Sequence, residues 1–180
     1  MKAKKRSKEP RLTPRQISNQ VFRRLRKHEA LNGLEEFAMF MGKAQVLEFG
    51  LKQLLARLYN YDSETMQRWT LGRTTQELKR SGLRADFIVL LESLVRYRNY
   101  IAHEYLANDA ILRRLMGGGD IGRLERKHFE HGIFELEQAI FLFDWCEKHD
   151  AWSRPPKKAH AAQLDAARTR VKPDQDLTSR

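Results

Sequence analysis

The sequence predicts an all-α protein, on three observations. Apolar residues recur every three or four positions in several long segments, which is the spacing of one buried helix face. No segment alternates apolar and polar residues as a half-buried strand does. With 180 residues, 41% of them hydrophobic, the chain is long enough for one domain with its own core. We therefore expect a single antiparallel bundle of helices.

The first part of the chain predicts two amphipathic helices. Thr13 and Pro14 are typical of an N-cap followed by proline at the first helical position. The residues after Pro14 form an apolar stripe at helical spacing, and basic residues lie beside this stripe. The segment 34–59 carries the strongest signal, because one face of it is built of leucine. Its expected buried residues are Leu47, Leu51, Leu54, Leu55 and Leu58.

Later segments complete the expected bundle. Ser63 is expected to cap a short helix, and a further helix is expected over 70–80, ending near Gly82. Residues 84–100 predict the next helix and 123–149 the last one. The last helix carries two apolar stripes. It therefore either runs through the middle of the bundle or presents one stripe to another subunit.

Positive charge is concentrated at the two ends of the chain. Residues 1–28 hold eleven Lys and Arg against one acidic residue, 29–150 hold 16 against 19, and 151–180 hold seven against three. We expect flexible basic arms at 1–12 and 151–180, and a folded domain over 13–150 with its core over about 30–150. Such arms suit sequence-independent contact with phosphate backbones. The alternative is a solubilising tail that has no partner.

Composition also indicates the compartment in which the protein works. The lone cysteine, Cys146, excludes an internal disulfide and is expected to pack in the core. No run of about 18 apolar residues is present, and no apolar segment follows the basic N-terminus as in a secretory signal. We expect a soluble cytoplasmic protein with no membrane partner.

The segment 96–105 holds the residues with catalytic potential. Arg98 lies four residues after Leu94, so it continues the apolar stripe of its own helix, where a charge needs a partner or a purpose. His103 lies five residues further, about 140° away around an α-helix. A site that uses both residues requires the helix to end or bend between them, or requires two copies of the chain.

Arg98, Asn99 and His103 resemble the Arg-x(4–6)-His motif of HEPN domains, which commonly has a polar residue after the arginine. Tyr105 extends the match to the His-x-Tyr form seen in HEPN toxins of bacterial toxin–antitoxin pairs. The resemblance includes the helical layout from about 34 to 149 and excludes both basic arms. It implies a HEPN-like bundle that acts as a homodimer, with two copies of the motif facing each other.

The resemblance also implies an activity. HEPN enzymes of this type are metal-independent endoribonucleases that need no cofactor and leave a 2′,3′-cyclic phosphate, and many are toxins or effectors of prokaryotic toxin–antitoxin or defence systems. His103 would exchange protons with the ribose 2′-hydroxyl and the leaving oxygen. Arg98 would hold the phosphate, and Asn99 would orient the phosphate or the imidazole. By the same analogy Tyr105 is the candidate modification site for a cognate nucleotidyltransferase antitoxin.

Further candidate RNA contacts flank the motif or lie on the basic face of the first helix. The two tyrosines among them suit stacking on bases, with packing as an equal alternative. These candidates are Tyr97, Tyr100, Arg96, Arg23, Arg26 and Lys27. Glu48, in the long helix, is a secondary candidate, and a helix-surface charge is the other interpretation of it.

Other interpretations remain open. Arg98 could pair with an acid such as Glu48 or Glu92, while His103 merely caps its helix. The protein could be a non-catalytic HEPN module that binds RNA or a protein partner. It could also be a helical scaffold that binds nucleic acid through its arms alone.

A metal site is a further candidate on the last helix. His128, His131 and Glu135 stand at helical spacing and could face a metal together. Scattered polar residues produce this spacing by chance, so no metal is expected.

Overall fold

The computed structural model describes residues 12–105 and 120–152, and every regular element within them is helical. The elements are α1 (Pro14–Leu25), η1 (Arg26–His28), α2 (Gly33–Tyr59), α3 (Ser63–Met66), α4 (Leu71–Arg80), α5 (Ala85–Tyr100), η2 (Ile101–Tyr105) and α7 (Asp120–His149). Here η1 is a 3₁₀ turn and η2 a π-helical turn. The all-α prediction is confirmed for these residues. None of their helices has the length and apolar character of a membrane span.

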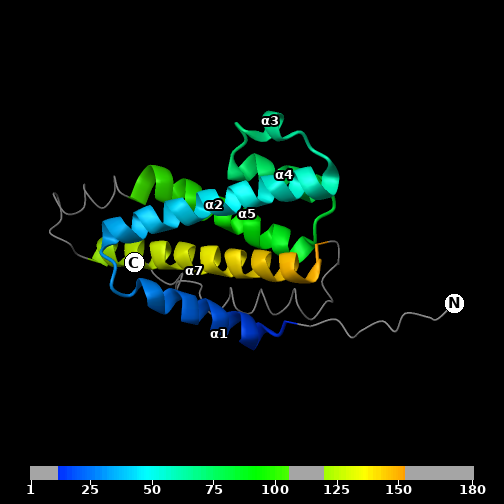
Figure 1. Cartoon of the computed structure of the whole chain (residues 1–180). Helices are drawn as coiled ribbons and strands as arrows, with labels where there is room; N and C mark the ends of the chain where they lie inside the picture. Colours follow the sequence, from blue (N-terminus) through cyan, green and yellow to red (C-terminus); the bar gives the residue numbers. More distant parts are fainter. Residues whose placement is uncertain (1–11, 106–119, 153–180) are drawn as a thin grey trace, which may run out of the picture.

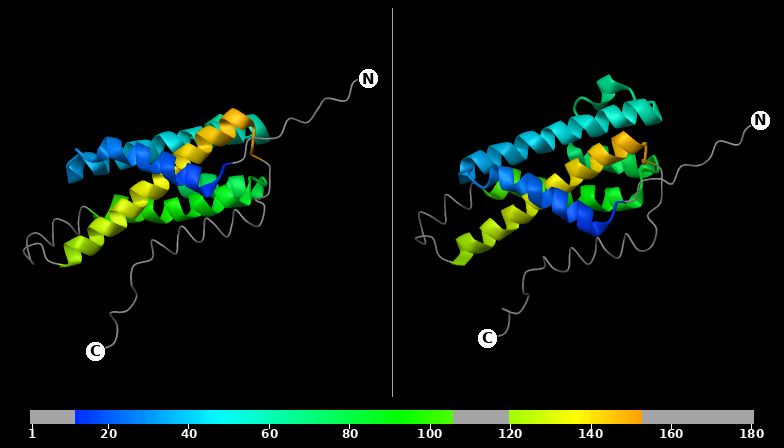
Figure 2. Two further views of the ribbon diagram at one scale, coloured as in Figure 1. Left: turned by 90° about the horizontal axis from the view of Figure 1, so that it is seen from below. Right: turned by 60° about the horizontal axis from the view of Figure 1, so that its bottom comes forward.

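Helix α7 lies at the centre of the bundle (Figure 1, Figure 2). Helices α1, α2 and α5 all pack against it, and α4 packs against both α2 and α5. A helix with neighbours on several sides needs more than one apolar stripe. The two stripes of this helix are therefore explained within one chain, and they give no argument for a second subunit.

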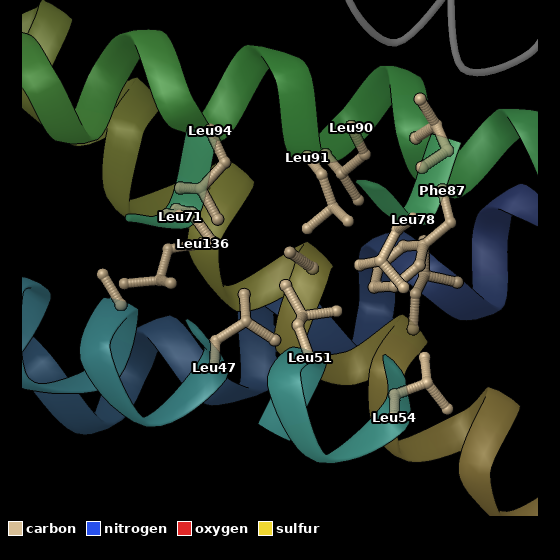
Figure 3. Packing of buried hydrophobic residues seen from close by; sticks show 14 of the residues in the cluster. Leu47, Leu51, Leu54, Leu71, Leu78, Phe87, Leu90, Leu91, Leu94 and Leu136 are labelled. Carbon is tan, nitrogen blue, oxygen red and sulfur yellow. The ribbon is translucent and has the colours of Figure 1, made fainter. Parts of the chain in front are cut away.

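The leucine faces of α2 and α5 are turned toward each other across the core (Figure 3). Leu51 of α2 and Leu91 and Leu94 of α5 have no exposed surface. Leucines of α4 and α7 complete the same cluster. Because the buried faces of α2 and α5 point at each other, their exposed faces point to opposite sides of the bundle.

Local sequence explains where most helices begin. The Thr13 hydroxyl accepts a hydrogen bond from the Gln16 backbone N–H, and the Gln16 side chain accepts one from the Thr13 N–H. This capping box stabilises the start of α1, and Thr13 is the N-cap as predicted. Asn32 and Glu35 form a second capping box at the start of α2.

The expected cap of the short third helix was wrong by one residue. The Asp62 carboxylate accepts the Thr65 N–H at 2.9 Å, so Asp62 precedes the helix and Ser63 is its first residue. Aspartate satisfies the exposed N–H groups of a helix start at least as well as serine does, and its charge suits that end of the helix.

Two expected boundaries of the core are corrected by the structure. Leu58 is 41% exposed, because it stands in the last turn of α2, two residues before the left-handed C-cap Asn60. At the other end, Ala151 and Trp152 were assigned to the tail but are buried. The Trp152 carbonyl accepts the Arg84 N–H at 2.9 Å, and its ring contacts Phe87. The folded part therefore extends to Trp152, while the arms at 1–11 and 153–180 lie outside the described residues.

The end of α7 is held to the start of α5 by Arg84. Its guanidinium donates two hydrogen bonds to Asp86 and one, of 3.1 Å, to the Ala151 carbonyl. Cys146 lies beside it and is 1% exposed, which confirms the expected core position. Burial raises the pKa of the Cys146 thiol to about 11. This cysteine is therefore a packing residue and a poor nucleophile at neutral pH.

A buried carboxylate on α7 ties three other elements to the central helix. The Glu137 side chain is 1% exposed and forms an ion pair with Lys43 of α2. His28 Nε2 of η1 lies 3.0 Å from the same carboxylate, and an Arg24 nitrogen of α1 lies 3.9 Å away. A carboxylate at this depth is tolerated only because basic groups surround it. The cluster therefore fixes α1, η1 and α2 against one point of α7.

We predict that Glu137→Ala lowers the free energy of unfolding by about 3 kcal/mol, because it leaves basic groups without their shared carboxylate. Glu147→Ala is a matched control, since Glu147 also links α7 to α2, through Arg57, but at the surface. That variant should lose about 1 kcal/mol or less. Urea unfolding of both variants measures the difference. Equal losses would show that the buried cluster is no more important than a surface pair.

Candidate functional site

The motif spans a change in helix winding. Arg98 and Asn99 lie in the last turn of α5, and His103 lies in the π-helical turn η2, which begins at Ile101. Hydrogen bonds from i to i+5 widen the helix and turn it by a smaller angle per residue. Two residues five positions apart therefore lie closer to the same helix face when a π-helical turn stands between them than they do in a continuous α-helix. Isolated π turns are frequent at functional sites, and here the turn falls between the two motif residues.

Arg98 has no acidic partner in the described part of the chain. It is half-buried, and the one hydrogen bond of its side chain there joins Nη1 to Asn99 Oδ1 at 3.5 Å, which is long for such a bond. Of the two suggested carboxylates, Glu48 pairs with Lys52 at 2.9 Å, and Glu92 pairs with Lys79 at 2.7 Å. Neither therefore accounts for the arginine on this stripe. Glu48 itself is a half-buried helix charge with its own partner.

His103 lies on the outward side of the same segment. Arg96, Asn99 and His103 are all exposed and follow at steps of three and four. They form one stripe that points away from the core, and the side chain of half-buried Arg98 reaches Asn99 of this stripe. The motif is thus presented at the surface of a single chain, without a wall of other described elements in front of it.

Tyr97 and Tyr100 pack on a histidine of α7. The His128 ring lies 4.8 Å from the Tyr97 ring and 4.5 Å from the Tyr100 ring, measured between centroids. The packing alternative therefore explains the position of both tyrosines. Sequence reasoning treated His128 only as a metal candidate. A contact between residues about 30 positions apart leaves no local pattern that would have revealed it.

Gly132 brings α7 close to the motif segment. A Cβ atom at this position would stand 2.8 Å from Ile101 Cδ1 and 3.4 Å from Tyr97 Cβ. Glycine thus allows α7 to cross directly over the junction of α5 and η2. A glycine inside a strong helix pattern is itself a signal of close packing, and this signal was present in the sequence.

Tyr105 is buried against α7. Its ring stacks on Phe129 with centroids 4.3 Å apart and an angle of 18° between the planes, and the residue is 7% exposed. A transferase would reach this side chain only if η2 moved away from α7. Modification of Tyr105 by a transferase stays a prediction, and it requires that η2 first move away from α7.

The basic residues expected to contact RNA lie elsewhere. Arg23, Arg26 and Lys27 are exposed on α1 and η1. Their helix meets α7 through contacts such as Phe22 with Phe134, at 5.8 Å between ring centroids. Position 134 stands about 200° around α7 from Gly132, which faces α5. The structure therefore places the basic face of α1 and the motif on different sides of α7.

The suggested metal ligands of α7 do not converge. Among the described residues, no group of three or more His, Cys, Asp or Glu side chains is arranged to hold a metal ion. His128 is instead engaged by the two tyrosines, and His131 lies one turn further along the helix.

No protein-family model, curated protein sequence or solved structure matches this chain.

The two α7 histidines are expected to make stability depend on pH. Burial lowers the pKa of His128, against a smaller opposing effect of the Glu104 carboxylate, and burial and the charge of His128 lower the pKa of His131. The unfolded chain binds these protons near pH 6.5, and the folded chain binds them only at lower pH. Protonation thus favours unfolding, and stability falls as the pH drops below about 6.5.

His128→Gln should reduce this loss, so that urea unfolding changes less steeply with pH than in wild type between about pH 5 and 7. Gln76→Ala, at an exposed position of α4 with no titratable group, is the control and should keep the wild-type slope. A slope in His128→Gln identical to wild type would contradict the assignment.

Proposed function

We propose that the protein is a metal-independent endoribonuclease of HEPN type that acts as a homodimer on cytoplasmic RNA. The observation that carries the proposal is the state of Arg98: half-buried, with no carboxylate partner in the described residues, and next to Asn99 in a segment that also presents His103. A cation kept without an anionic partner on a partly buried stripe suits an anionic ligand such as a phosphodiester.

Each motif residue has a role that its chemistry supports. Arg98 would hold the scissile phosphate and stabilise the charge that develops on its oxygens. Exposed His103 would take the proton from the ribose 2′-hydroxyl, or donate one to the leaving 5′-oxygen. The 2′-oxygen then bonds to phosphorus as the bond to the 5′-oxygen breaks. The products are a 2′,3′-cyclic phosphate and a free 5′-hydroxyl. Asn99 would orient the arginine to which it is hydrogen bonded.

A second copy of the chain would complete the site. One chain contributes one copy of the motif, and its His103 is exposed on the outward side of the segment whereas its Arg98 is half-buried. The stripe of Arg96, Asn99 and His103 points away from the core. Two copies docked through this side would form two equivalent sites, each with Arg98 of one chain and His103 of the other.

We propose that the nuclease is a toxin or effector whose activity slows growth. A neighbouring antitoxin, such as a nucleotidyltransferase, would restrain it. Expression of the chain alone should then slow growth, and expression of Arg98→Ala should not.

The test is cleavage of total cellular RNA by purified wild type, Arg98→Ala and His103→Ala proteins in excess EDTA. We expect wild type alone to cut and to leave cyclic phosphate ends, with a loss of at least about a hundredfold in each variant. Arg68→Ala and His149→Ala are matched controls at exposed positions away from the motif, and both should cut like wild type.

The other outcomes each have a definite meaning. No cutting by a folded wild-type protein across RNA pools would favour a module that only binds RNA or a protein. Equal cutting by all variants would indicate a contaminating nuclease. Loss of RNA binding on removal of residues 1–11, with no effect at Arg98, would favour binding through the basic arm.

A further inference from the structure

One side of α2 is exposed and carries no charge. Between residues 36 and 56 every exposed side chain of this helix is uncharged, although 32% of the whole chain is charged. Val46 and Phe49 are 72% and 63% exposed, and Leu34 at the start of the helix is 66% exposed. A solvated helix face usually carries charges, and a continuous exposed apolar strip indicates an interaction surface. We call the following set the α2 face: Leu34, Ala38, Gly42, Gln45, Val46, Phe49 and Gln53.

Side-chain size changes along the α2 face. After Leu34 at its start, its first half has the small residues Ala38 and Gly42, and its second half has the bulky residues Val46 and Phe49. A Cβ atom added at Gly42 would meet nothing within 4 Å, so the surface there is open. One half of the face thus offers room, and the other half offers side chains that would fill it.

This order of sizes is self-complementary under a two-fold axis. If two copies of α2 pack antiparallel about a point near Ala44, Val46 of each copy lies opposite Gly42 of the other. Phe49 then lies opposite Ala38. The pairing places large side chains against small ones at both ends, which is the isologous contact of a symmetric dimer.

Charges at the borders of the face would not oppose this pairing. Lys43 is already paired with Glu137 of the same chain, and Lys52 with Glu48. Half-buried Phe37 and Met41 widen the apolar strip beside its small-residue half. Docking therefore covers apolar surface without leaving either lysine with an unmatched charge.

We infer that the α2 face binds the α2 face of a second copy of this chain in an antiparallel pair. The strip is about 28 Å long and about 10 Å wide, so each copy contributes roughly 300 Å². Stable specific interfaces cover about 800 Å² per partner. The association is therefore reversible and increases with protein concentration. It is independent of the proposed nuclease dimer, because the motif stripe of α5 lies on the opposite side of the bundle.

Cysteine cross-linking tests the pairing directly. In the antiparallel pair, residue 45 of one copy lies within about 5 Å of residue 45 of the other along the helix axes, whereas the two copies of residue 53 are about 28 Å apart. Gln45→Cys and Gln53→Cys are thus matched variants on one exposed face. Native Cys146 is buried, and the raised pKa of its thiol leaves it unreactive.

With a short bis-maleimide and increasing protein concentration, we expect a cross-linked dimer from Gln45→Cys and none from Gln53→Cys. Adding Val46→Glu to Gln45→Cys should abolish the cross-link, and helical circular dichroism should show that this exposed substitution leaves the fold intact.

Equal cross-linking at both positions would overturn the antiparallel pairing, since it indicates parallel or random contact. Absence of cross-linking at both positions would show that the α2 face does not bind a second copy. Another protein, or residues of this chain outside the described ranges, would then be the candidate that covers it. RNA cleavage measured on the same variants is a separate readout, which none of the three substitutions should change.

Discussion

The arrangement of this bundle depends on a buried negative charge in its central helix. Glu137 is almost fully enclosed, and it is tolerable there because Lys43, His28 and Arg24 approach it from α2, η1 and α1. Apolar stripes alone allow helices to slide or rotate, whereas a carboxylate with basic groups on several elements allows one arrangement. With α7 held in this way, Gly132 is placed over Ile101 and Tyr97, and the motif segment is fixed against the same helix.

Much of the fold could be predicted because it depends on local rules. Leucine spacing in α2 and the Thr13 cap of α1 are properties of neighbouring residues, and both predictions were confirmed. What could not be predicted depends on contacts between distant residues. The packing of Tyr100 on His128 and the bond from Arg84 to the Trp152 carbonyl join positions tens of residues apart. The spacing of apolar residues also does not show where a helix extends past the elements that pack on it. For this reason the prediction that Leu58 is buried was wrong.

The candidate site shows the same division. The motif residues were chosen by resemblance, and the structure adds that Arg98 is without an acidic partner among the described residues and that the helix winding changes at Ile101. It also changes the argument for a dimer. The two stripes of α7 are satisfied within one chain, so self-association has to be argued from exposed surfaces. Two such surfaces exist on opposite sides of the bundle: the polar motif stripe of α5, which suits a shared RNA site, and the apolar α2 face.

The central claim is that Arg98 of one chain and His103 of another act in one site. Mixing Arg98→Ala protein with His103→Ala protein, after brief unfolding and refolding together, tests it most directly. Half of the dimers then contain one chain of each kind, and each of these has one intact Arg98–His103 pair. The account predicts that the mixture recovers about a quarter of wild-type RNA cleavage, although each protein alone is inactive. A mixture as inactive as its two components would contradict a site shared between chains.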